Sequence, residues 1–152
     1  MKLDAAIAAV RKDERELVER LRVLGERHKA DHDVFHMAET LGRLHRANLD
    51  ALGADGDGPS DGAGLVDRAR EKTSELLGRR PETGLLLVRD LRELHVLYAQ
   101  ASIDWVILGQ GAQAARDAEL LETVTTCHAQ TLRGMKWTVT RIKEAAPQAL
   151  TG

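Results

Sequence analysis

Apolar residues recur at heptad spacing in the segment VRKDERELVERLRVLGERH, residues 10–28, and one position of that stripe is a carboxylate. The apolar positions are Val10, Leu17, Leu21 and Leu24. Glu14 falls on the same helical face. A helix with such a face packs it against other helices, and a carboxylate buried among apolar side chains costs free energy unless it has partners. The segment therefore predicts a helical fold with a polar group in its core.

The other long segments are helical by the same criterion. Their apolar residues follow helical spacing, none alternates over a long run, and Ala, Leu, Arg and Glu dominate. We expect long helices at residues 3–28, 34–52, 81–108 and 114–146, and a short amphipathic helix at 65–77. Two hairpins of long helices joined by a crossover make an all-α, antiparallel four-helix bundle, with the short helix in the crossover.

Capping and turn-forming residues set these boundaries. Asp31 or Asp33 can cap the second long helix, although the junction HKADHD could also continue as a single rod of about 50 residues. The stretch GADGDGPSDGAG, residues 53–64, predicts a loop. The glycines just after residue 108 end the third long helix, and Pro147 ends the fourth.

Composition limits the number of domains and the classes of partner. The 152 residues, 43% of them hydrophobic, fit one domain spanning residues 1–152. Lys and Arg number 22 and Asp and Glu 24, without a block of one sign, so we expect no nucleic-acid or membrane partner. No apolar run approaches the roughly 20 residues that cross a bilayer. The start MKLDAAIAAVRKDERE has no secretory pattern and Cys127 has no disulfide partner, so we expect a cytoplasmic protein.

Each of the other three long helices places a histidine on its apolar face. The faces are Ala38, Leu41, His45, Leu49 and Leu52; Val88, Leu91, His95, Tyr98, Ser102 and Trp105; and Leu121, Val124, His128, Thr131, Met135 and Ile142. With the hairpin turns near residues 31 and 112, the paired side chains agree in height to within about one helical turn. Glu14, His45, His95 and His128 are therefore expected to converge in one layer.

Two interpretations of this layer stay open. Three neutral imidazoles and a carboxylate suit Zn, Fe, Mn, Co or Cu, and bundles build such sites from facing helices. The same four side chains could instead satisfy one another as a hydrogen-bonded layer that fixes the helix packing and binds no metal. A metal site predicts Glu14, His45, His95 and His128 as ligands, whereas the hydrogen-bonded layer predicts no cofactor.

Several residues are weaker candidates for a role near the layer. They are Tyr98, Thr131, His28, His36 and Glu39. Tyr98 lies one turn from His95 and is interpreted as a hydrogen-bond partner, a redox-active neighbour or a core aromatic residue. On an unbroken helix His28, His32 and His36 could form an exposed metal-binding ladder, which Glu39 could extend. The Asp-rich junction favours ordinary surface or junction histidines and a solvated glutamate instead. Cys127 is interpreted as a small buried residue, and Trp105 as a packing or helix-interface residue.

The order of these segments resembles the ferritin-like superfamily, in particular the YciE/YciF-type stress-associated bundles. The segments that carry the resemblance are ERELVERL, HRANLDAL, GLVDRAREKTSELLG, TGLLLVRDLRELHVLY and RDAELLETV. The resemblance implies an antiparallel bundle with a central metal site. In that family the first helix supplies a Glu, which Glu14 matches, and the second a His, which His45 matches. His95 and His128 lie where the family tends to place site residues on the last two helices.

The chain departs from the di-iron members of that superfamily. The residues three positions before His45, His95 and His128 are not glutamates, so both Glu-x-x-His motifs are missing. One inward carboxylate lacks the charge to hold two metal ions. Ferroxidase or oxygenase chemistry is therefore not expected, and a mononuclear site agrees better with these residues.

Three functional hypotheses follow from the sequence. The first is a cytoplasmic, ferritin-like metal-binding protein with a stress-related role implied by the resemblance. The second is a structural or interaction bundle, forming a homo-oligomer, whose inner polar layer fixes helix register. The third is a metal-dependent enzyme acting on a small molecule, which would need an open coordination position.

Overall fold

The computed structural model describes residues 2–53 and 83–152, and within them the chain forms four long helices and no strand. The helices are α1 (Lys2–Arg27), α2 (His32–Ala51), α4 (Thr83–Ala114) and α5 (Ala118–Thr151). The all-α prediction is confirmed for this part of the chain. The predicted short helix at 65–77, and the predicted loop apart from Gly53, lie outside the described residues.

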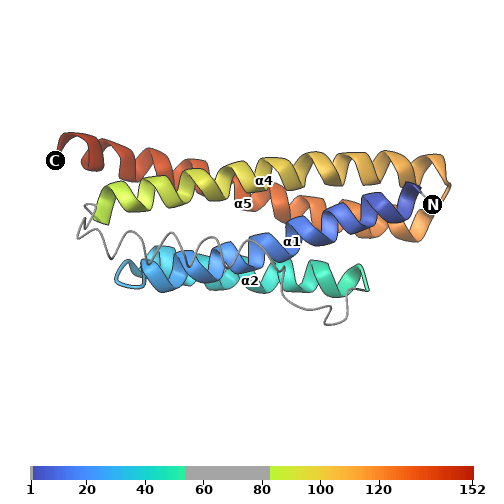
Figure 1. The fold of residues 1–152 in the computed structure, drawn as a ribbon, viewed down its shortest axis with the longest axis horizontal. Helices are drawn as coiled ribbons and strands as arrows, with labels where there is room; N and C mark the ends of the chain where they lie inside the picture. The colour runs from blue at the N-terminus through green and yellow to red at the C-terminus, as the bar shows by residue number, and fades with distance from the viewer. Residues whose placement is uncertain (1, 54–82) are drawn as a thin grey trace.

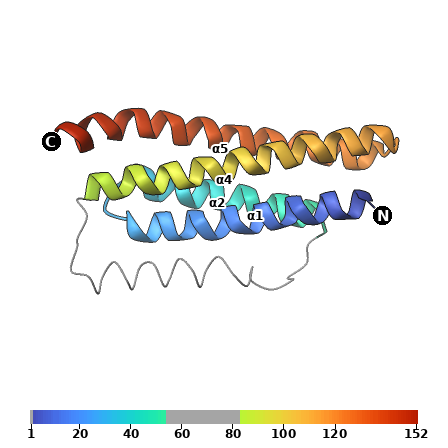
Figure 2. The ribbon, with the colours of Figure 1, turned by 45° about the horizontal axis from the view of Figure 1, so that its top comes forward.

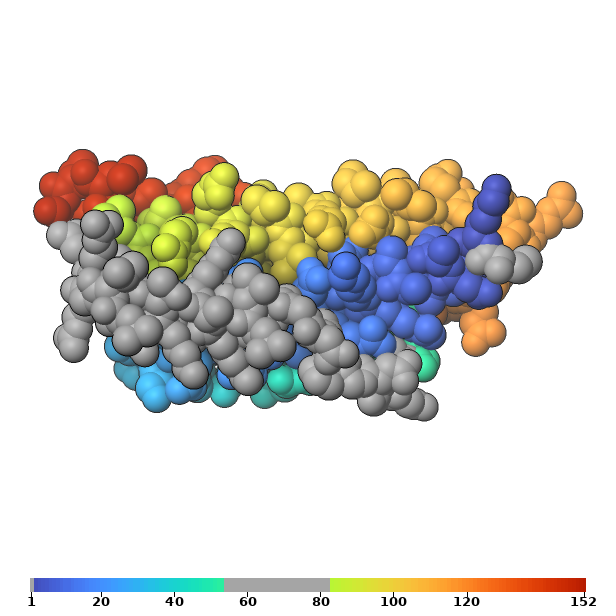
Figure 3. Space-filling view, in the orientation of Figure 1, coloured from blue at the N-terminus to red at the C-terminus, as the bar shows by residue number. Residues whose placement is uncertain are grey.

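The four helices pack as a bundle of two hairpins (Figures 1 and 2). Helix α1 packs against α2 and α4, and α5 packs against α4 and α2. Each helix runs antiparallel to the helices that it packs against, whereas α2 and α4 run in the same direction. Figure 3 shows α1 and α4 side by side along one face of the molecule. The predicted antiparallel four-helix bundle is therefore what the described residues form.

The core positions of every helix alternate between steps of three and four residues. In α4 the buried series is Leu87, Leu91, Leu94, Tyr98, Ala101, Trp105, Leu108 and Ala112. In α5 it is Val124, Cys127, Thr131, Gly134 and Thr138. This spacing is the heptad seam of helices that pack at a shallow angle, with side chains of one helix inserted between those of its neighbour.

The junction between α1 and α2 is a real break. The Asp31 side chain caps α2 by accepting a hydrogen bond from the Val34 backbone N–H at 3.2 Å. The same carboxylate is 2.6 Å from the Arg141 guanidinium of α5. Although burial alone would raise it, these hydrogen bonds and the arginine charge hold the pKa of Asp31 below its usual value. The chain therefore turns at this junction, and a continuous rod is excluded.

Two of the predicted helix ends are wrong, and so is the predicted start of the last helix at residue 114. Helix α5 begins at Ala118, because the Asp117 side chain caps it by accepting from the Leu120 backbone N–H at 3.0 Å. Helix α4 continues past Gly109 to Ala114, because Gly109 is buried against Val124 of α5 and this helix packing outweighs the low helix propensity of glycine. Helix α5 continues past Pro147 to Thr151, where the Gly152 N–H closes the last turn on the Gln148 carbonyl. Proline removes one backbone donor, and the exposed last turn tolerates this loss.

Polar pairs add to the apolar contacts between α1 and α4. Asp90 accepts hydrogen bonds from Arg27 at 2.9 Å and pairs with His28 at 2.7 Å. Arg20 lies 3.3 Å from Glu93 in a partly exposed ion pair. None of the helices in the described residues carries an apolar stretch long enough to span a membrane.

Candidate functional site

The Glu14 carboxylate lies in the centre of the bundle and is fully buried. Its Oε1 accepts a hydrogen bond from Trp105 Nε1 at 3.0 Å. The Thr131 hydroxyl lies 3.5 Å from the same oxygen and shares its single proton with the Cys127 carbonyl at 3.3 Å. Its Oε2 is 2.7 Å from His45 Nδ1 and 3.4 Å from Asn48 Nδ2. The donors come from α2, α4 and α5. Both carboxylate oxygens are therefore hydrogen-bonded, with at least one donor from each of the other three helices.

His45 links Glu14 to Tyr98. Its Nδ1 faces the carboxylate, and its Nε2 lies 2.7 Å from the Tyr98 hydroxyl. Burial, together with the nearby Glu14 charge, raises the pKa of Tyr98 well above its usual value, so the phenol keeps its proton. Since the phenol donates to Nε2, the tautomer that fits both contacts carries its N–H at Nδ1 and donates it to the carboxylate. Both ring nitrogens of His45 are therefore hydrogen-bonded.

This polar layer, which we define as Glu14, His45, Asn48, Tyr98, Trp105 and Thr131, separates two apolar parts of the core. One part contains Leu17, Leu21, Leu41 and Leu91. The other contains Val10, Leu52, Leu108 and Val124. Water has little access to the layer, because every member except Asn48, at 4% exposed, has no exposed surface. Its hydrogen bonds are therefore stronger than they would be in solvent.

His95 and His128 lie apart from this layer. His95 Nδ1 is 2.8 Å from the Thr138 hydroxyl, and His128 Nε2 is 2.9 Å from the Ser102 hydroxyl. Both histidines are only partly buried, at the contact between α4 and α5. Leu94 and Cys127, the residues just before them, occupy the buried seam instead. Of the four predicted ligands, the fold brings together only Glu14 and His45.

In the part of the chain that the structure describes, the side chains do not form the metal site that the resemblance implies. Within residues 2–53 and 83–152, no group of three or more His, Cys, Asp or Glu side chains is placed to hold a metal ion. Glu14 and His45 could offer two ligands, but their polar atoms already bond to neighbours from other helices. A mononuclear site normally needs three or four protein ligands.

The sequence prediction missed two members of the layer. The sequence predicts Trp105 as a packing or helix-interface residue, whereas its indole N–H donates to Glu14, and Asn48 is not among the predicted site residues. Asn48 follows His45 by three residues and precedes the buried Leu52 by four. A strict alternation of three and four residues, counted from His45, would have placed Asn48 on the seam of α2.

The weaker candidates lie in the layer, on the surface and at the α1–α2 junction. Thr131 is buried and bonds Glu14, whereas His36 and Glu39 are exposed, as expected. His28 lies in the predicted junction but is buried, because it pairs with Asp90. Cys127 is 2% exposed, as predicted, and burial, together with the Glu14 charge, raises the pKa of its thiol to about 11.

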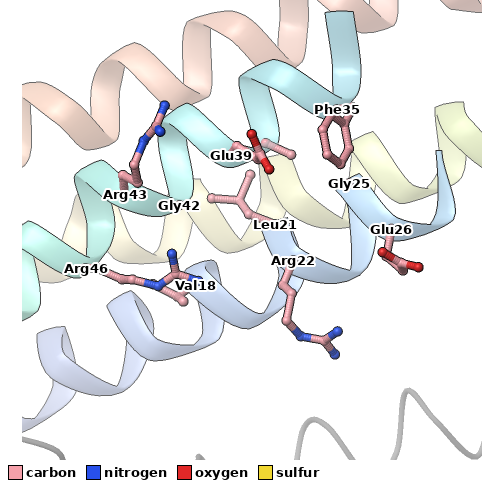
Figure 4. A pocket seen from close by; sticks show the side chains of 11 residues that line it. Val18, Leu21, Arg22, Gly25, Glu26, Phe35, Glu39, Gly42, Arg43 and Arg46 are labelled. Atoms are coloured by element: carbon pink, nitrogen blue, oxygen red, sulfur yellow. The ribbon is translucent and has the colours of Figure 1, made fainter. Parts of the chain in front are cut away.

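A shallow groove runs over the outside of the α1–α2 hairpin (Figure 4). Small residues shape it: a Cβ on Gly25 would lie only 3.2 Å from Ala38 Cβ, so the two helices approach closely there. Phe35, Arg22 and Arg46 are among the side chains around it. Glu14 and His45 are not among the residues that line this groove.

Comparison with known proteins gives no relative: no family profile, curated protein or solved structure matches the chain.

Proposed function

We propose that this chain is a non-catalytic structural and interaction module, a ferritin-like helical bundle whose central polar layer sets helix pairing instead of holding a metal. The observation that carries the proposal is the surroundings of Glu14. Donors from all three other helices converge on one buried carboxylate, at distances from 2.7 to 3.5 Å.

Such a layer acts on specificity more than on net stability. Burying a carboxylate costs several kcal/mol, and hydrogen bonds recover that cost only when all donors are in place. A slip of one helix by a heptad would align apolar seams equally well but would leave Glu14 without its partners. The layer therefore favours one register and one partner order among the four helices.

The ferritin-like part of the proposal is supported by helix order and direction. Two antiparallel hairpins pack so that the first helix contacts the third and the second contacts the fourth. In that superfamily, as the resemblance implies, the centre of the bundle is where metal ligands lie. Here Tyr98 and Trp105 fill that level and direct their polar atoms at His45 and Glu14.

The competing hypothesis is a transition-metal site on Glu14 and His45, and metal content separates the two. We would purify the protein without an affinity tag and measure Fe, Zn and Mn before and after incubation with each ion. Glu14→Gln and the exposed-site control Glu39→Gln would be measured in parallel. The proposal predicts no stoichiometric metal in any of the three proteins. About one ion per chain, absent from Glu14→Gln and retained in Glu39→Gln, would overturn it.

A further inference from the structure

Helix α4 carries a second heptad seam on its outer surface. Val96, Ile103 and Val106 are 55%, 60% and 45% exposed, and Ile107 beside them is 55% exposed. The steps of three and four, the same spacing as in the buried seam, are followed by Val96, Ala99, Ile103, Val106 and Gln110. A helix with one packing face needs one such seam. The second seam indicates a further helical partner.

The outer seam is also free of charge. Residues 96–115 contain a single charged side chain, Asp104, in a sequence that is 30% charged. Asp104 lies beside Asp13 of α1, on the side of α4 away from α5. Depletion of charge marks the centre of protein interfaces more clearly than apolar content alone.

Helix α5 continues this surface with a matching seam. Its exposed positions Glu122, Thr125, Ala129, Leu132 and Lys136 again follow steps of three and four. Leu132 is 49% exposed and lines a groove between α4 and α5 together with Val106 and Thr125. Exposed large aliphatic side chains that gather on two neighbouring helices are typical of a protein-binding surface.

The charges at the two ends of the α5 seam have opposite sign. The hydrogen bond between Ser102 and His128 marks where α4 and α5 lie level. Lys136 follows His128 by eight residues and Glu122 precedes it by six, which at about 1.5 Å per residue is about 12 Å and 9 Å. A two-fold axis near this level would place Lys136 of each copy opposite Glu122 of the other. The surface is thus complementary to itself.

We propose that the α4–α5 outer surface, Val96, Ile103, Val106, Ile107 and Leu132 with the flanking Glu122 and Lys136, binds a second copy of this chain about a two-fold axis. The proposal rests on the assignment of the chain as an interaction module and names its partner. A two-fold interface uses the same patch on both copies, so each apolar contact and each charge pair occurs twice. The partner is a second α4–α5 hairpin lying antiparallel across the first.

The first test is the association state of the full chain by sedimentation at several concentrations. Wild type and Leu150→Glu, a substitution at a 73% exposed site outside the patch, are expected to be dimers. Ile103→Glu is expected to raise the dissociation constant by at least about thirtyfold, because the charge is buried twice. Circular dichroism checks that the variant is folded. A wild type that stays monomeric at tens of micromolar overturns the proposal and leaves the surface to a different partner.

The second test uses charge reversal. Lys136→Glu or Glu122→Lys alone is expected to weaken the dimer several-fold, and the double variant to recover wild-type affinity, since each pair forms only between copies. The double variant failing to recover overturns the two-fold geometry. Metal analysis of the same samples keeps the two proposals separate: a metal-bound dimer contradicts the proposed function alone, and a metal-free monomer contradicts this interface alone.

Discussion

A Cβ atom on Gly134 would lie 2.2 Å from Tyr98 Cζ, so the missing side chain of this glycine makes the space that the tyrosine ring occupies. Gly134 sits on the buried seam of α5, where an apolar side chain would otherwise be expected. The ring in that space carries its hydroxyl to His45, and His45 in turn reaches Glu14. One glycine thus positions a chain of hydrogen bonds that crosses the bundle.

Gly134→Ala should destabilise the protein. The added methyl overlaps the buried Tyr98 ring, and overpacking of this kind costs about 1–3 kcal/mol. The matched control is Gly42→Ala in α2, where a Cβ meets nothing within 4 Å and alanine should stabilise the helix by about 0.5–1 kcal/mol. Urea unfolding of both variants measures the difference. Equal effects of the two substitutions would contradict the packing described for Tyr98.

Acid should weaken the contact between α1 and α4 through Asp90. Although burial alone would raise it, the His28 hydrogen bond and the Arg27 charge hold the pKa of Asp90 below its usual value. The unfolded chain then binds the proton more readily, so this contribution is present above about pH 4 and is lost as pH falls through the folded pKa. Asp90→Asn should lower stability at pH 7 by about 1.5–3 kcal/mol and flatten the acid limb of the profile. An unchanged acid limb would argue against this assignment.

Asp13 should have the opposite effect at higher pH. Burial and the neighbouring Asp104 raise the pKa of Asp13 to about 8, while Gln100 donates to it at 2.9 Å. The folded chain holds this proton more tightly than the unfolded chain, so stability should fall as pH rises from about 4 to about 8. Asp13→Asn mimics the protonated acid and should remove that fall.

The exposed-site control for this experiment is Asp33→Asn, which should keep the wild-type profile. Unfolding free energies at pH 5 and pH 8 give the comparison. A wild type equally stable at both values would show that Asp13 loses its proton without cost to the fold.

Cys127 should be unreactive in the native protein. Its thiol is 2% exposed, and its pKa of about 11 leaves little thiolate at neutral pH. A thiol-specific reagent at pH 7.5 should label it only at the rate of unfolding, and denaturant should release one reactive thiol per chain. Rapid labelling of native protein would mean that α5 opens locally around the polar layer.

The sequence was sufficient to place Glu14 and His45, because large aliphatic residues mark the seams of α1 and α2 clearly. In α4 it was not. That helix has apolar residues on nearly every side, since it carries an inner and an outer seam, and its periodicity allowed His95 as well as Leu94 to face the core. The spacing of apolar residues cannot separate two seams on one helix.

In α5 the difficulty came from small side chains. Its buried seam includes Cys127, Thr131, Gly134 and Thr138, none of which marks a core position by hydrophobicity. They are small where the large Tyr98 and Trp105 of α4 take the space. Met135 and Ile142 lie beside the seam and are larger, so the apolar pattern predicts a face that also includes His128. Complementary volumes between two helices depend on their pairing, which a pattern within one helix does not contain.

The central claim is that Glu14 sets the pairing of the helices through hydrogen bonds and not through a metal ion, so that removing the carboxylate leaves its buried donors without an acceptor. Denaturant unfolding of wild type, Glu14→Gln and Glu14→Leu, each with and without a strong chelator, tests it most directly. We predict a loss of about 3–5 kcal/mol in Glu14→Leu, since His45, Asn48 and Trp105 lose a shared acceptor. Glu14→Gln should lose less, because its amide oxygen still accepts from Trp105, and the chelator should change nothing. A wild type that the chelator alone destabilises to the level of Glu14→Leu would contradict the account.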